Sequence, residues 1–214
     1  LSNSIAYQHN CHVQGIDFNP VAVERAIEVA KVLKLITRFS VQDLFLYEPE
    51  EKFDLAISLG VLHHTENCAE AIRQIGINCV KSGGYFFIGL YHTYGRAPFL
   101  NHFKKLKGEG MSDDALFNEY KALHSSIKDE MLVYSWFRDQ VLIPHETQHT
   151  LEMVCKTFDE IEIDLVSTSI NGFNPIYSRE DLFEQEKALE EIGQQKLADH
   201  EYYPGFFVVL GKKR

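Results

Sequence analysis

Two acidic residues that directly follow short strand-like runs are the first candidates for chemistry in this sequence. Asp17 comes after the run Val13–Ile16, and the next residues suit a helix start, with Asn19 as its cap and Pro20 in its first turn. In open parallel sheets ligands bind outside the carboxyl ends of the strands, where an acid can accept hydrogen bonds from both hydroxyls of a ribose. Asp43 follows a second such run, Thr37–Val41. Alternatively, Asp17 only caps the helix that follows it.

Two adjacent histidines follow a third strand. The strand Phe53–Leu59 is almost continuously apolar, as expected for one buried between helix layers, and His63 and His64 come soon after it. Histidine exchanges protons near neutral pH, so either ring is suited to take a proton from a hydroxyl or amine. Alternatively, one histidine caps the next helix and the other packs beneath it.

A different pattern, H-E-x-x-H, occurs at His145–His149. On a helix, histidines at this spacing share one face and bind zinc in metallopeptidases, with the glutamate as general base. Pro144 directly before the motif indicates a helix start or a loop instead, and no third-ligand motif follows, although Glu160 or Glu162 can be proposed. We therefore predict no metal site. His145 and His149 are expected to line the substrate side, or alternatively to serve as surface and capping residues.

The elements that must position these residues alternate between strand and helix. Alternation of this kind predicts an α/β fold with a mostly parallel sheet and helices on both faces. The glycines of Lys81–Gly84 are expected to end the second helix. The predicted strands are residues 12–16, 37–41, 53–59, 85–90, 160–167 and 205–210, and the predicted helices are 21–33, 67–80, 151–158 and 179–198, the last with a solvated charged face.

The alternation stops between Tyr91 and about His149, in a polar, aromatic and mostly helical stretch. We predict a core of residues 1–95 and 150–214, interrupted by a helical insertion at 96–149 that forms a lid or substrate wall. Tyr91, Tyr94 and Arg96 are expected on its substrate side. Alternatively, the aromatic residues are mostly the core of the insertion itself.

Composition limits the possible partners. The chain has 214 residues, 45% of them hydrophobic, and a net charge of −10, which suits one globular α/β domain and disfavours nucleic acid as a partner. No apolar run approaches the ~20 residues that a membrane-spanning helix needs. The four scattered cysteines indicate reduced thiols, so we expect a cytoplasmic protein, with a small-molecule substrate and without a signal peptide.

Four stretches in this order resemble the class I S-adenosylmethionine-dependent methyltransferases. They are Gly15–Asp17, Asp43, Phe53–His64 and Lys81–Tyr85, and the resemblance is close over residues 1–95. It implies a Rossmann-like fold with a seven-stranded type of sheet. The family's first strand and its glycine-rich turn, which approaches the methionine part of the cofactor, have no counterpart before Leu1. We therefore expect the natural protein to be longer than this chain.

The resemblance also assigns roles to residues. Asp17 would hold the ribose hydroxyls of S-adenosylmethionine, Phe18 would lie against the adenine, and Asp43 would accept from the adenine amino group. Gln42 and the Leu44 backbone would lie beside the adenine, and the methionine end would be lined by Ser58, Leu59 and Gly60. His63 and His64 would face the site of methyl transfer.

The predicted function is transfer of a methyl group to an oxygen, nitrogen or carbon atom of a small or lipid-like acceptor. A methyltransferase-like module that binds without catalysis is the first alternative, because a strand is missing. A zinc metallopeptidase acting through His145, Glu146 and His149 is the last.

Overall fold

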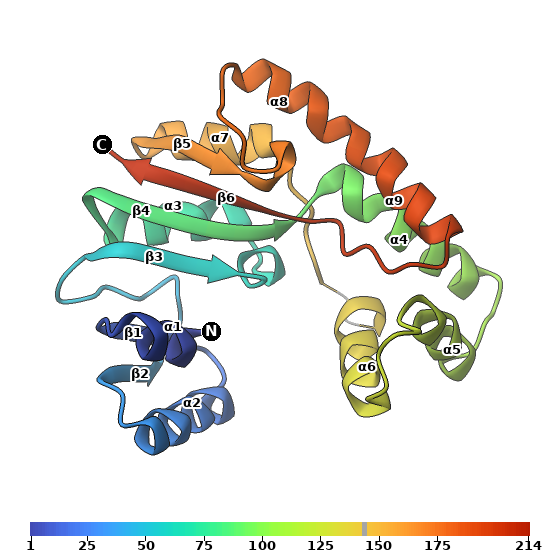
Figure 1. The fold of residues 1–214 in the computed structure, drawn as a ribbon, viewed down its shortest axis with the longest axis horizontal. Helices are drawn as coiled ribbons and strands as arrows, with labels where there is room; N and C mark the ends of the chain where they lie inside the picture. Colours follow the sequence, from blue (N-terminus) through green and yellow to red (C-terminus); the bar gives the residue numbers. More distant parts are fainter. Residues whose placement is uncertain (143–144) are drawn as a thin grey trace.

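The computed structural model describes residues 1–142 and 145–214, so Pro144 and the prediction based on it lie outside the described residues. Its strands form two sheets (Figure 1). The small sheet pairs β1 (Val13–Asp17) with β2 (Thr37–Val41) in parallel. The large sheet has the order β3-β4-β6-β5, with β3 at Phe53–Leu59, β4 at Val80–Tyr91, β5 at Ile163–Thr168 and β6 at Phe206–Lys213. Only β6 runs antiparallel to its neighbours, which confirms the predicted α/β, mostly parallel fold.

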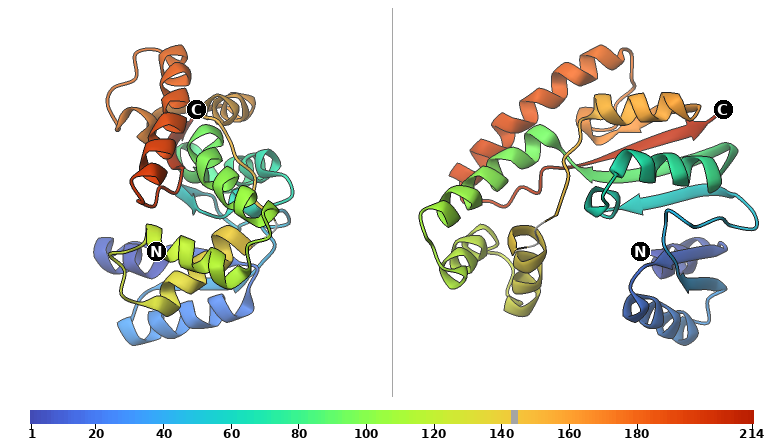
Figure 2. Two further views of the ribbon diagram at one scale, coloured as in Figure 1. Left: turned by 90° about the vertical axis from the view of Figure 1, so that its right-hand side faces the viewer. Right: turned by 180° about the vertical axis from the view of Figure 1, so that it is seen from behind.

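The two sheets are not hydrogen-bonded to each other. Figures 1 and 2 show β1 as the strand of the small sheet that lies nearer to β3. Within residues 1–142 and 145–214, no strand pairs with the second edge of β1 or of β3. Leu55 on β3 is 47% exposed. In the described residues, the facing edges of β1 and β3 are thus both unpaired, at the place where the resemblance implies a further strand.

Helices cover the sheets in the expected layers. The small sheet has α1 (Ser2–His9) and α2 (Pro20–Leu33) beside it, and α2 starts as predicted, with the Asn19 side chain accepting from the Val21 amide. One face of the large sheet is covered by α3 (Cys68–Asn78) and α7 (Leu151–Glu160) (Figure 2). The main core lies between this face and these helices, where Phe86 packs on Phe158.

The stretch around the predicted insertion, called the insertion below, contains α4 (Thr93–Gly108), α5 (Asp113–Leu123) and α6 (Glu130–Phe137), followed by a π turn at Arg138–Leu142. It has a hydrophobic core of its own that includes Phe99, Phe103, Tyr120 and Phe137. These aromatic residues therefore agree with the alternative prediction, in which they form the core of the insertion itself. The insertion also packs on the C-terminal helices, because α9 (Leu189–Ala198) lies along α4.

Two local predictions were wrong. The segment Lys81–Gly84 does not cap α3, which ends at Asn78, but belongs to β4. It forms a bulge between the pairs Phe53–Val80 and Leu55–Tyr85, with Gly83 at φ +75°. The predicted charged helix at 179–198 divides into α8 (Arg179–Gln185), a 3-10 turn at Glu186–Ala188 and α9. This segment is not simply a solvated face, because Glu186 is buried.

Among the described residues, no helix is both long enough and apolar enough to cross a membrane.

Candidate functional site

The carboxyl ends of β1 and β2 lie side by side and carry the two predicted acids. Asp17 is the last residue of β1, and its backbone oxygen accepts from the Gln42 amide at 3.0 Å. The Asp17 carboxylate accepts from the Asn19 amide at 2.8 Å, and the Asp43 carboxylate accepts from the Phe45 amide at 2.9 Å. Each carboxylate thus stabilises a local turn. Because both side chains are exposed, their oxygens can also accept hydrogen bonds from a ligand.

The other predicted cofactor residues occupy the same edge of the sheets. Phe18 is 80% exposed directly after Asp17, whereas Leu44 is half-buried against the main core. Ser58 and Leu59 end β3, and Gly60 follows at φ +73° with nothing within 4 Å of the position of a Cβ atom. This conformation favours glycine, and it leaves open space at the tip of β3.

His63 lies in the 3-10 turn Leu62–His64 and is buried beneath the tip of the sheet. Its Nδ1 accepts from the Tyr91 amide at 3.3 Å, so the proton of the neutral ring sits on Nε2, which has no partner among the described residues. Burial lowers the pKa of His63 to about 3, and the nearby charges of His64, His149 and Arg96 act in the same direction. His63 is therefore a neutral packing residue and is not suited to act as the predicted base.

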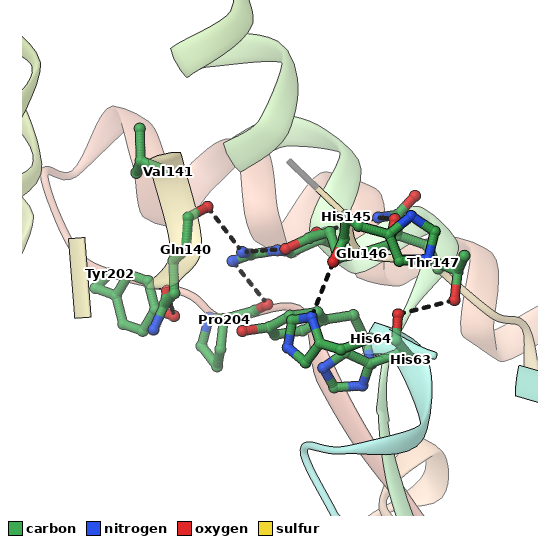
Figure 3. A network of polar contacts seen from close by, with 12 residues as sticks. His63, His64, Gln140, Val141, His145, Glu146, Thr147, Tyr202 and Pro204 are labelled. Atoms are coloured by element: carbon green, nitrogen blue, oxygen red, sulfur yellow. Dashed lines mark hydrogen bonds and ion pairs between the residues drawn. The ribbon is translucent and has the colours of Figure 1, made fainter. Parts of the chain in front are cut away.

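His64 differs from His63 in both exposure and hydrogen bonding. It is half-buried, its ring centroid lies 4.3 Å from that of His63, and its Nδ1 is 3.0 Å from the backbone oxygen of His145 (Figure 3). A carbonyl oxygen only accepts, so Nδ1 of His64 carries the proton and Nε2 keeps its lone pair. No hydrogen bond within the described residues occupies this Nε2 atom. Of the two histidines, His64 is thus the one equipped to accept a proton.

The H-E-x-x-H segment is extended instead of helical. His149 forms a parallel bridge with His92, and its amide donates to the Tyr91 oxygen at 2.9 Å. Nε2 of His145 is bound to the Thr65 oxygen at 3.1 Å, and Nε2 of His149 to the Thr147 hydroxyl at 2.9 Å. The described residues contain no group of three or more histidine, cysteine or acidic side chains placed to hold a metal ion. The arrangement gives the zinc alternative no support.

Glu146 of this segment instead pairs with Arg96 on α4. Arg96 is fully buried, and two of its nitrogens donate to the two carboxylate oxygens of Glu146 at 3.1 and 3.0 Å. Its guanidinium also lies 4.1 Å from the ring centroid of Tyr91 and 4.3 Å from that of Phe99. Burial alone would lower the pKa of Arg96, but the hydrogen bond and charge of Glu146 raise it. Since its charge is already matched by Glu146, Arg96 is not an open anion-binding group.

The two tyrosines predicted on the substrate side, Tyr91 and Tyr94, lie in different surroundings. Tyr91, at the end of β4, packs 4.2 Å from the ring of His63, and burial raises its pKa. Tyr94 lies in the first turn of α4, where its ring packs on His92, and no ring contact joins it to the histidine pair among the described residues. Tyr91 and Arg96 thus belong to the His63–His64 cluster, together with His145 and His149 of the extended segment, and Tyr94 lies outside it.

Sequence reasoning missed several residues of this region. The only sequence signal at Glu146 is its place in the H-E-x-x-H pattern, and its partner Arg96 was predicted to face the substrate. The buried pair His92 and Glu186, whose Nε2 and carboxylate oxygen are 2.8 Å apart, gave no sequence signal because the two residues come from distant elements. Here His92 caps α4 through its Nδ1, which accepts from two backbone amides.

Comparison with known proteins gives a consistent assignment. The family model described as a methyltransferase domain matches residues 1–141. Among solved structures, the chain resembles the magnesium protoporphyrin IX methyltransferase of Synechocystis PCC 6803 with bound SAH (17% identity, TM-score 0.57, covering 100% of this chain and 68% of that one). It also resembles a SAM-dependent methyltransferase of Methanosarcina mazei (14% identity, TM-score 0.58, covering 100% and 86%).

A third structure, PKMT2 from Rickettsia typhi, aligns at 12% identity with a TM-score of 0.70. The alignment covers 99% of this chain but only 47% of PKMT2, so the chain spans about half the length of that protein. At these identities the structures establish the fold alone. A search of curated proteins found no match.

The family model covers well over half of the chain. The chain therefore belongs to the methyltransferase-domain family, as its resemblance to the class I S-adenosylmethionine-dependent enzymes predicts.

Proposed function

We propose that the chain is the catalytic domain of an S-adenosylmethionine-dependent methyltransferase, in which His64 accepts the proton of the methyl acceptor. The observation that carries the proposal is the hydrogen bond from Nδ1 of His64 to the His145 oxygen, because it leaves Nε2 with a lone pair beside the sheet tips. The family match supports the methyl-transfer activity.

The cofactor is S-adenosylmethionine, and the residues at the strand tips fit it. Asp17 and Asp43 present exposed carboxylates for the ribose hydroxyls and the adenine amino group, and Phe18 offers an exposed ring for stacking. The open space at Gly60 suits the methionine end, alongside Ser58 and Leu59.

The protein's task in this reaction is alignment and proton removal. When bound, S-adenosylmethionine supplies a methyl group whose bond to the sulfonium breaks as its bond to the acceptor atom forms, leaving S-adenosylhomocysteine. His64 then takes the acceptor's proton at Nε2, and its Nδ1–H bond to the His145 oxygen stabilises the resulting imidazolium.

The acceptor we propose is a small or lipid-like molecule with an oxygen, nitrogen or carbon nucleophile. This choice is supported by the apolar side chains exposed on α6, where Met131 is 84% and Tyr134 47% exposed, and by the net charge of −10, which disfavours nucleic acid. A cytoplasmic location belongs to the same proposal, supported by the four free cysteines.

Methyl transfer from labelled S-adenosylmethionine tests the proposal directly. The acceptors are panels of small phenols, primary amines and carboxylic acids, and of long-chain acids and alcohols. For any acceptor that turns over, His64→Gln should lower kcat by roughly 10²–10⁴-fold, as loss of a general base does, while S-adenosylhomocysteine binding stays unchanged. The exposed His9→Gln is the matched control. Full turnover by His64→Gln would contradict the role of His64, and cofactor binding without turnover of any acceptor would favour the non-catalytic alternative.

A further inference from the structure

We propose that the extended segment 145–149, called the strap below, is a positioning element that sets the tautomer of His64, with Glu146 as its anchor. The inference rests on the proposed role of His64 as proton acceptor. It assigns to this segment a purpose that is unrelated to metal binding, although its sequence has the form of a zinc motif.

The strap is attached to the sheet tips by backbone hydrogen bonds at two positions. The Thr147 amide and hydroxyl both donate to the His63 oxygen, at 2.8 and 3.0 Å. At the end of the strap, the Thr93 amide donates to the His149 oxygen at 3.0 Å, which complements the bond from His149 to Tyr91. These bonds place the strap beside the 3-10 turn that carries both histidines, as Figure 3 shows.

The strap and the histidine turn also exchange side-chain bonds in both directions. The His64 ring donates through Nδ1 to the His145 oxygen, and the His145 ring donates through Nε2 to the Thr65 oxygen at 3.1 Å. Both acceptors are carbonyls, so each ring must carry its proton on the bonded nitrogen. His64 is therefore held in the Nδ1–H form, whereas an imidazole in water prefers the Nε2–H form.

The neighbouring His63 takes the opposite form. Its Nδ1 accepts from the Tyr91 amide, so its proton is on Nε2. Two adjacent rings with centroids 4.3 Å apart thus carry their protons on different nitrogens. The form of His64 is set by a backbone oxygen of the strap and that of His63 by a backbone amide of β4, so only the form of His64 depends on the position of the strap.

Glu146 ties the strap to the insertion. Its carboxylate pairs with the fully buried Arg96 of α4, which also contacts the backbone oxygens of Gln140 and Pro204 at 3.4 and 3.5 Å. A Gln at position 146 keeps the shape but removes the charge that matches Arg96, so the strap should loosen and the His145 oxygen should move away from His64. Glu146 and Arg96 are thus positioning residues that act through His145.

The tautomers are measurable by two-bond ¹H–¹⁵N correlation spectra of the chain labelled with ¹⁵N-histidine, at about pH 8 where free imidazoles are neutral. We expect His64 to be mainly Nδ1–H and His63 mainly Nε2–H, with signals assigned from His64→Gln and His63→Asn. In Glu146→Gln, His64 should change to mainly Nε2–H while His63 keeps its form. Glu152→Gln, an exposed glutamate on α7, is the matched control and should change neither ring.

A second variant covers the case in which Glu146→Gln does not fold. Thr147→Val retains the ion pair but loses the hydroxyl bonds to the His63 oxygen and to His149, and should shift the His64 tautomer in the same direction. An Nε2–H form of His64 in the unaltered chain would overturn the proposal, as would an unchanged tautomer in both strap variants. The spectra need neither cofactor nor acceptor, so this outcome is separate from the turnover test of the proposed function.

Discussion

At the scale of single residues, burial makes His63 a source of pH-dependent stability. Its pKa is lowered from 6.5 to about 3, so between these values the unfolded chain binds a proton that the folded chain does not. The contribution of His63 to the free energy of unfolding is therefore fully present above about pH 6.5. It is lost as the pH falls toward 3, with a slope of about 1.4 kcal/mol per pH unit. Burial lowers the pKa of His149 in the same direction.

Urea unfolding of His63→Asn at several pH values isolates this contribution. Asparagine offers a non-titrating acceptor near the position of Nδ1, so the variant should lose less free energy of unfolding between pH 6.5 and 4 than the unaltered chain. His9→Gln, at an exposed position, should follow the unaltered chain. Equal pH slopes for the unaltered chain and His63→Asn would show that His63 is protonated equally in both states.

The histidine pair also shows where prediction from sequence ends at this scale. The sequence predicted that His63 and His64 follow a strand tip, which is confirmed, but it could not say which of the two is suited to be the base and which packs in the core. Their difference depends on two backbone partners, the Tyr91 amide and the His145 oxygen, which come from distant segments. No local pattern reports such long-range partners.

At the scale of elements, the start of β6 approaches α4 so closely that only glycine fits. Gly205 has φ +58°, and a Cβ atom there would lie 2.3 Å from the Arg96 amide nitrogen. Gly205→Ala should therefore lower the free energy of unfolding by about 1–3 kcal/mol, since both the strain and the clash are with backbone. Gly108→Ala, at the end of α4 with nothing within 4 Å, is the control, and it should be neutral or slightly stabilising. Equal midpoints in urea for the two variants would contradict this packing.

Elements with a strong local signal were predictable, and those decided by tertiary contacts were not. The run Phe53–Leu59 and the cap at Asn19 and Pro20 are confirmed, because apolar pattern and capping act within a few residues. The strap was not predicted as an extended segment, because its bridge to His92 and its bonds to His63 are long-range. Glu186 was expected on a solvated face but is buried against His92 for the same reason.

At the scale of the whole molecule, the alternation of strands and helices predicted the fold class, and the resemblance of four stretches to the class I methyltransferases predicted the family. What the sequence did not show is how the parts meet: the small sheet pairs with no strand of the large one, while α4 packs on α9 from the other end of the chain. Figure 1 shows the small sheet and the α5–α6 helices lying on the same side of the large sheet. The strand tips carry Asp17, Asp43 and Gly60, which we propose as cofactor residues.

Calorimetric titration of S-adenosylhomocysteine into the chain tests whether the strand tips bind the cofactor through Asp17. We expect saturable binding to one site, weakened in Asp17→Ala by about 1–3 kcal/mol, or about five- to 150-fold in Kd, because the ribose hydroxyls lose a charged acceptor. Asp54→Ala is the matched control, since Asp54 lies near the start of β3, away from the strand tips, and its side chain is 90% exposed. Absence of binding to the unaltered chain, or equal Kd values for the chain and Asp17→Ala, would contradict the proposed cofactor site.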